Sequence, residues 1–295
     1  MGMSLAARQS RWSAAVRRAR AWISLVRLDR TLAATLYALL GAYLVAGAGA
    51  LAGSAVVRAT VVVGLVVAFG FALNDYCDVR VDSIGRPHRP IPSGRISRRA
   101  AGRLACVLAA TALAIASTLG SRMAAIAAAT LLLGAAYSFR LKDTLLLGNG
   151  AMALLVSTIP IFGAFAAGTL TPGVLAAASM TFPYIFAQEV LYNVEDERAD
   201  RQAGLRTTAT RLGVARALRL FRVLAGIFIV LAIFPWVLGI ARDGYLYAVL
   251  FCSVVPTLAV IGWLTLRGTE EAISLAVNVT RLTWLPSFIP LVLLR

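Results

Sequence analysis

The segment LNDYCDVRVDSIGRPHRPIPSG, Leu73 to Gly94, carries three aspartates directly after one of the most apolar stretches of the chain. Of the 295 residues, 60% are hydrophobic and only 14% are charged. Soluble domains rarely have this composition, and apolar runs long enough to cross a bilayer fill most of the sequence. The chain is therefore predicted to be an all-α integral membrane protein, with these aspartates at the edge of the membrane.

Nine candidate spans follow from apolar runs of suitable length, since a hydrocarbon core needs roughly 20 apolar residues. They cover residues 31–52, 55–74, 100–119, 123–137, 149–168, 173–192, 217–240, 244–265 and 272–293. Arginines gather before the first span and after the even-numbered spans, whereas the other connections are nearly free of charge. Because positive residues accumulate in cytoplasmic loops, the N-terminus and the ends of the even-numbered spans are predicted to be cytoplasmic, and the C-terminus outside.

The net charge of +16 reflects the same asymmetry, because the basic residues line one predicted membrane face. Their expected partners are anionic lipid head groups, and no nucleic-acid groove is predicted. Residues 1–26 are predicted to form a basic interfacial segment, followed by a nine-helix domain over residues 27–295. His88 is the single histidine, which excludes a histidine metal cluster and a Ser-His triad in the usual form.

Eight of the 13 acidic residues fall in two short segments, each at the end of an even-numbered span. They are Asp75, Asp78, Asp82, Glu189, Glu195, Asp196, Glu197 and Asp200. If the second span continues as a helix, Asn74, Asp78 and Asp82 recur at four-residue spacing and share one face. The sixth span repeats this pattern in the series Glu189, Asn193, Asp196 and Asp200. Both acidic faces are therefore expected on the same side of the membrane.

Carboxylates stacked at this spacing repel one another and are costly to desolvate near lipid, so cations must neutralise them. Either nearby arginines such as Arg80 and Arg198 pair with them on solvated helix ends, or a divalent metal binds. Oxygen-only ligands suit Mg²⁺, which is usually completed by substrate phosphates. An apolar bundle then suggests a lipid-like diphosphate, with its head at the aspartates and its tail between the helices. Candidate phosphate contacts on the same face are Arg86, Arg89, Arg140 and Lys142.

These motifs resemble the two aspartate-rich signatures of the UbiA superfamily of intramembrane prenyltransferases. The resemblance rests on NDYCDVRVD and RPIPSG after the second span, YSFRLK after the fourth, and YNVEDERADRQAGLRTTA after the sixth. It implies a helical bundle with a cytoplasmic-face active site, in which two Mg²⁺ bridge the aspartates to an isoprenoid diphosphate. The allylic C–O bond then ionises to a carbocation, which a lipid-soluble or aromatic acceptor captures.

Positions that match the motifs of the superfamily imply which residues form the site. Asn74, Asp78 and Asp82 would hold one metal, and the four aspartates of both motifs form the catalytic set. Asp196 and Asp200 would hold the second metal. The substrate-binding residues implied in the same way are Asn74, Asp75, Arg86, Arg89, Tyr137, Arg140, Lys142, Glu189, Asn193 and Arg206.

The acceptor is less well defined by the resemblance. Val79 stands where members that act on hydroxybenzoates often carry arginine, and the loops look closer to the branch that forms ether lipids and chlorophyll. A terpene cyclase of the same superfamily would use the same metal-diphosphate site without an external acceptor. A transporter would instead place acidic residues near mid-span or beside paired helix breaks. The acids of this chain follow the apolar runs, which favours the prenyltransferase.

Overall fold

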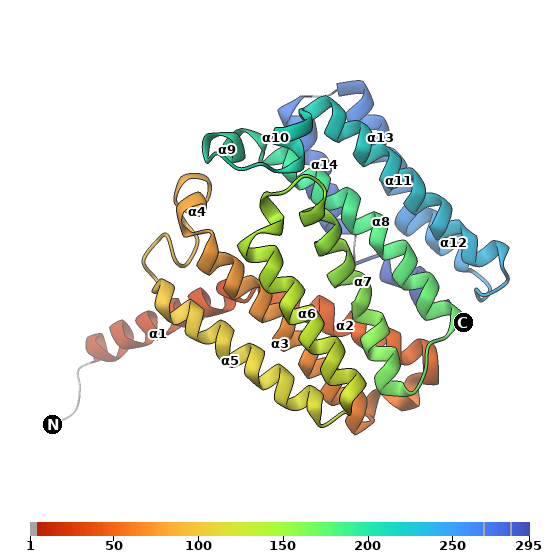
Figure 1. Cartoon of the computed structure of the whole chain (residues 1–295), viewed down its shortest axis with the longest axis horizontal. Helices are drawn as coiled ribbons and strands as arrows, with labels where there is room; N and C mark the ends of the chain where they lie inside the picture. The colour runs from red at the N-terminus through yellow and green to blue at the C-terminus, as the bar shows by residue number, and fades with distance from the viewer. Residues whose placement is uncertain (1–4, 268, 284) are drawn as a thin grey trace.

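The computed structural model describes residues 5–267, 269–283 and 285–295, and their regular structure is helical apart from an isolated bridge between Ala241 and Leu294. The helices pack side by side as a bundle (Figure 1). Within the described ranges, nine helical segments are long and apolar enough to cross a membrane. The predicted class of fold is therefore confirmed, whereas the side of the membrane on which each end lies stays a prediction.

The membrane-length segments of the described chain follow one another, with the longest connections at residues 78–97 and 196–213. They are α2 (Leu28–Ala46), α3 (Ser54–Cys77), α5 (Arg98–Ser117), α6 (Ser121–Phe139), α7 (Leu147–Ala167), α8 (Pro172–Glu195), α11 (Val214–Val237), α12 with α13 (Tyr245–Val249 and Val255–Arg267) and α14 with α15 (Glu270–Thr283 and Phe288–Val292). A π-helical turn, Leu250–Val254, joins α12 to α13. Three short helices lie in the connections: α4 (Val79–Gly85), α9 (Glu197–Gln202) and α10 (Thr208–Leu212).

The first span ends earlier than predicted, because α2 stops at Ala46 and does not reach residue 52. Gly47 follows with a φ of 69°, a left-handed conformation that ends helices and favours glycine. The next residues, Ala48–Ala52, form a 3-10 turn. This turn is as apolar as the helix before it, so composition alone did not reveal the boundary.

The two motif helices also differ from the continuous helices that the spacing suggested. α3 and α8 end immediately before Asp78 and Asp196, whose φ and ψ are −88° and 8°, and −87° and −1°, respectively. Backbone hydrogen bonds nevertheless cross each break. The N–H of Asp78 donates to the carbonyl of Asn74 at 2.9 Å, and the N–H of Asp196 donates to that of Tyr192 at 2.9 Å. The four-residue register therefore persists into α4 and α9.

Two glycines allow α2 and α7 to approach closely. A Cβ on Gly41 would lie 2.0 Å from the carbonyl oxygen of Pro160, and one on Gly163 would lie 1.8 Å from that of Ala38. Any larger residue would therefore push the two backbones apart. This contact fixes α2 against the centre of the bundle, where α7 also packs on α8.

The N-terminal helix α1 (Leu5–Leu25) runs away from the bundle at its start and joins it at its end (Figure 1). Ala21 and Leu25 are fully buried against α3 and α5. Residues 1–4 of the predicted interfacial segment lie outside the described residues, and the interfacial role of the remainder stays a prediction.

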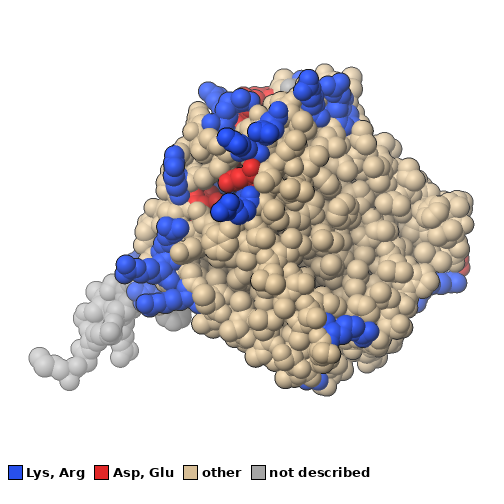
Figure 2. Space-filling view, viewed as in Figure 1, with Lys and Arg blue, Asp and Glu red and all other residues tan. Residues whose placement is uncertain are grey.

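Charged side chains gather at one end of the molecule, around α4 and α9, as Figure 2 shows for one face. The broad surface beside them carries few charged side chains (Figure 2). Large hydrophobic side chains are exposed there and elsewhere, including Leu132, Phe251 and Leu266 at 71%, 72% and 84%. A surface of this kind is stable against lipid tails and not against water.

Candidate active site

A cavity of about 830 Å³ extends from the two aspartate motifs into the bundle. Most of the predicted site residues line its polar end: Asn74, Asp78, Asp82, Arg86, Arg89, Tyr137, Lys142, Glu189, Asn193, Asp196 and Asp200. The deeper wall is mainly apolar and includes Val62, Val66, Phe69, Leu155, Ile159 and Phe162. A head group with several charges and a hydrocarbon tail would each find a matching environment in this cavity.

Three predicted site residues do not line the cavity. Asp75 is buried behind the polar end, where Arg27 and Arg89 approach its carboxylate at 3.2 and 3.4 Å. Arg140 and Arg206 are exposed. The structure therefore connects Asp75 to the site through its arginine partners and leaves the other two at the surface.

Two basic residues neutralise the first aspartate motif. Lys142, from the turn after α6, donates to Asp78. Arg89 donates to Asp82 at 2.7 Å. Asp82 is only 3% exposed, and a carboxylate removed from water requires a compensating charge.

An arginine in the loop after the first motif neutralises Asp196 of the second motif. Arg86 donates to both carboxylate oxygens of Asp196 at 2.8 and 2.6 Å. Burial and the negative charge of Asp196 raise the pKa of Asp200 to about 6, and a hydrogen bond from Thr207 lowers this pKa in part. A further cation beside these two aspartates would favour their ionised forms.

The donor set fits a hard divalent cation. The amide oxygen of Asn74 is buried and has no hydrogen-bond partner among the described residues, and Asp78 and Asp82 follow it at four-residue steps. Oxygen ligands of this kind suit Mg²⁺. Within the described ranges, no three Asp, Glu, Cys or His side chains are grouped closely enough to hold one metal. A metal held here would therefore need oxygen ligands beyond these side chains, such as those of phosphate or water.

Several residues that the motifs did not indicate also line the polar end, namely Arg27, Arg30, Asp143, Tyr192 and Arg281. Arg27 sits between α1 and α2 with a φ of 45°, and its guanidinium lies 4.5 Å from the centre of the Phe71 ring. Burial, which outweighs the attraction of Asp75, lowers its pKa to about 10. Arg281 belongs to the ninth predicted span, and an arginine inside an apolar span is a signal that could have revealed it.

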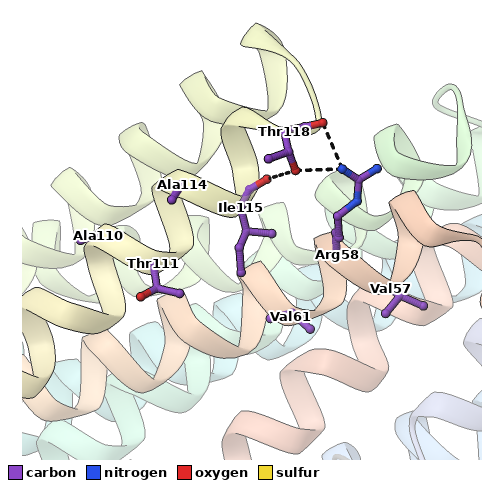
Figure 3. A pocket seen from close by; sticks show the side chains of 8 residues that line it. All are labelled: Val57, Arg58, Val61, Ala110, Thr111, Ala114, Ile115 and Thr118. Atoms are coloured by element: carbon purple, nitrogen blue, oxygen red, sulfur yellow. Dashed lines mark hydrogen bonds between the residues drawn. The ribbon is translucent and has the colours of Figure 1, made fainter.

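A second hollow lies at the opposite end of α3, against α5 (Figure 3). Its charged residue is Arg58, which donates to the carbonyl oxygen and the hydroxyl of Thr118 at 3.2 and 2.8 Å. A cation at the carboxyl end of α5 complements the helix dipole. This contact explains an arginine near the start of α3, at a membrane face that carries little other positive charge.

The chain matches the UbiA prenyltransferase family over residues 34–280. A digeranylgeranylglyceryl phosphate synthase of Korarchaeum cryptofilum is 37% identical over 207 residues, which are 70% of this chain and 73% of that protein. The enzyme of the same name from Sulfolobus acidocaldarius is 29% identical over 256 residues, which are 87% of this chain and 92% of that one.

Solved structures share the fold. A digeranylgeranylglyceryl phosphate synthase superposes with a TM-score of 0.76 at 20% identity, over 93% of this chain and 97% of that one. A UbiA homologue from Archaeoglobus fulgidus bound to GPP and Mg²⁺ superposes with a TM-score of 0.70 at 19% identity, over 92% and 99%. Since the family match spans most of the sequence and relatives exceed 30% identity, the chain belongs to the UbiA prenyltransferase family and is a membrane prenyltransferase.

Proposed function

We propose that the chain transfers a prenyl group from an isoprenoid diphosphate to the free hydroxyl of a glyceryl phosphate ether lipid. The observation that carries this proposal is the meeting of both aspartate motifs with basic side chains at the polar end of one apolar cavity. The names of the relatives support the choice of acceptor. If digeranylgeranylglyceryl phosphate is the product, the acceptor is geranylgeranylglyceryl phosphate and the donor is geranylgeranyl diphosphate.

Mg²⁺ is part of the proposal, and the Archaeoglobus fulgidus homologue with GPP and Mg²⁺ supports it. Asn74, Asp78 and Asp82 would hold one ion. Asp196 and Asp200 would hold the other. Bound there, the metal would stabilise the negative charge that builds on the departing diphosphate.

The basic residues of the polar end have two roles in this proposal. Lys142, Arg89 and Arg86 now carry hydrogen bonds to carboxylates. The same donors have the charge and geometry that phosphate oxygens require, with arginine able to bind two oxygens at once. Their present partners keep them directed into the site, so little reorganisation is needed when a diphosphate arrives.

The apolar wall protects the reacting carbon. Heterolysis of the allylic C–O bond leaves positive charge on the prenyl group and negative charge on the diphosphate. Phe69, Phe71 and Tyr137 line the cavity, and aromatic faces stabilise a nearby cation. Exclusion of water by this wall prevents capture of the cation by water and leaves the acceptor hydroxyl as the nucleophile. Its oxygen forms the new C–O bond and its proton passes to the departing diphosphate.

We also infer that the site faces the cytoplasm. The support is the charge asymmetry of the sequence and the gathering of charged side chains around α4 and α9 (Figure 2). A cytoplasmic site would receive the water-soluble diphosphate head while the tail enters from the bilayer.

Product analysis tests the proposed function. The purified protein is incubated with Mg²⁺, geranylgeranyl diphosphate and either geranylgeranylglyceryl phosphate, an aromatic acceptor or no acceptor. We expect digeranylgeranylglyceryl phosphate from the first mixture and no prenylated product from the others. A cyclised hydrocarbon formed without acceptor would instead assign the chain to the cyclases of the superfamily.

A further inference from the structure

Arg30, Tyr192 and Arg281 line the polar end of the cavity, although the two arginines come from opposite ends of the chain. Arg30 lies in the first turn of α2, and Arg281 in the last turn of α14. All three side chains line the same cavity. The guanidinium of Arg281 lies 5.0 Å from the centre of the Tyr192 ring, and Arg30 faces the same cavity.

These two arginines are not used by the aspartate motifs. Among the described residues Arg30 has no ion pair, and its side chain is exposed to the cavity. Arg281 pairs with Glu195 at 3.3 Å, while its Nε is buried without a hydrogen-bond partner in the described chain. A buried donor without an acceptor is unfavourable, so the pair of arginines is suited to an anion that neither Glu195 nor the aspartates supply.

We propose that Arg30, Tyr192 and Arg281 form a second anion site, which binds the phosphate of the acceptor. This inference rests on the proposed function and adds to it the residues that recognise the acceptor. Two guanidinium groups match a phosphate monoester, which carries close to two negative charges at neutral pH. The site is distinct from Arg86, Arg89 and Lys142, which face the aspartates and the donor.

The spacing of the two anion sites fits a glyceryl phosphate. Tyr192 lies four residues before Asp196 on α8, which corresponds to one helical turn of about 5.4 Å, and the N–H of Asp196 donates to the Tyr192 carbonyl. In a glyceryl phosphate ether, the free hydroxyl lies within two carbons of the phosphate ester. A phosphate held beside Tyr192 therefore places that hydroxyl close to the donor head group at Asp196.

The acidic neighbours explain why both arginines are required. Glu195 competes with the phosphate for Arg281. Glu189 lines the cavity one turn before Asn193, and the charges of Arg30 and Arg27 act on it. A single arginine would leave the phosphate facing these carboxylates with too little positive charge. The two together offset them.

Enzyme kinetics with two acceptors, one with and one without the phosphate, test the site. Arg30→Gln and Arg281→Gln are compared with Arg216→Gln, which removes an exposed arginine of α11 that does not line the cavity. At saturating geranylgeranyl diphosphate, we expect the first two variants to raise the KM for geranylgeranylglyceryl phosphate at least about tenfold. The KM for the donor should not change, nor should the KM for the corresponding glyceryl ether without phosphate. Lysine at either position should restore part of the loss.

The outcomes that overturn the site are equally specific. A rise in the KM for the donor with no change for the acceptor would assign these arginines to the diphosphate. An equal rise in the acceptor KM of Arg216→Gln would show that the effect comes from general surface charge and not from this site. Because Arg281→Gln leaves Glu195 without its partner, the double variant with Glu195→Gln is measured as well, and an acceptor KM that returns to normal there would also contradict the proposal.

A binding measurement separates this inference from the proposed function. Thermal unfolding is recorded in detergent and chelator with geranylgeranylglyceryl phosphate, because binding of the acceptor phosphate to arginines requires no metal. We expect this lipid to stabilise the wild type and Arg216→Gln, and not Arg30→Gln or Arg281→Gln. If the lipid stabilises the protein in this pattern but is never prenylated, the anion site stands and the proposed reaction fails. If it gives no stabilisation, the anion site is wrong whichever product is formed.

Discussion

Arg86 joins the two aspartate motifs: from the loop after α4, its guanidinium donates to both carboxylate oxygens of Asp196, 110 residues away in the chain. α4 and α9 also touch, since a Cβ on Gly85 would lie 3.9 Å from the Cβ of Ala199. The two aspartate motifs at the polar end of the cavity are thus held together by the protein itself. This arrangement allows the motifs to be tested as one unit.

A double-mutant cycle measures the coupling of this pair. Arg86→Gln and Asp196→Asn are expected to be less destabilising together than the sum of the two changes, because each alone leaves a half-buried charge without its partner. The pair of Arg201 and Glu197 within α9 serves as the control, because its arginine is 62% exposed, and its coupling should be smaller. The measurement is thermal unfolding in detergent with chelator, and equal coupling in both pairs would contradict the structural link.

Metal and diphosphate are expected to bind cooperatively. A diphosphate is repelled by the carboxylates unless Mg²⁺ intervenes, so each ligand should raise the affinity for the other by the same factor. A non-ionisable thio-linked prenyl diphosphate with Mg²⁺ should stabilise the protein by about 2.7 kcal/mol at 100 times its Kd. The stabilisation should vanish with chelator and in Asp78→Ala or Asp196→Ala, and both variants should also lose turnover. Full stabilisation in chelator would rule out binding through metal.

The topology prediction concerns the side of the membrane. Reporters fused after Ser93 and after Gln202 should both be cytoplasmic, and one after Thr169 should be outside, because arginine gathers in the connections after even-numbered spans. Protease accessibility in sealed vesicles gives an independent reading. The two aspartate motifs on opposite sides would be incompatible with one shared cavity.

The contact between α2 and α7 predicts a strong effect of a single methyl group. Gly163→Ala would place a Cβ 1.8 Å from the Ala38 carbonyl oxygen and should lower stability by about 1–3 kcal/mol, since the backbones must separate. Gly262→Ala on α13 is the control, because its Cβ would meet nothing within 4 Å. The two variants are compared by thermal unfolding in detergent. Because alanine has the higher helix propensity, Gly262→Ala should be neutral or slightly stabilising, and a similar loss in both variants would contradict the close contact.

Much of the fold was predictable because a bilayer dictates the length and apolarity of each span. Helix boundaries were less predictable, since they depend on single backbone conformations such as the positive φ of Gly47. The breaks before Asp78 and Asp196 had no signal in the apolar pattern. The hydrogen bonds across each break preserve the four-residue register on which the prediction of two acidic faces depended, so residues of both faces line one cavity.

The periodic part of the site was predicted better than its loops. Asn74, Asp78 and Asp82 line the cavity as their spacing indicated. Arg140 and Lys142 are two residues apart, but Arg140 leaves the end of α6 with a φ of −141° and is exposed, while the following 3-10 turn directs Lys142 toward Asp78. Side-chain directions in such a turn follow from local backbone angles, which no helical period describes.

The depth of the cavity has a consequence for the choice among donors. Along α3 the lining residues extend from Asn74 back to Val62, a helical length of about 18 Å. A hydrocarbon tail that leaves the bilayer for this wall exchanges one apolar environment for another, so each methylene gains only a small difference in van der Waals contact. Donors of different length are therefore distinguished in small, cumulative steps, and a shorter prenyl diphosphate should be a poorer substrate by degrees without being excluded outright.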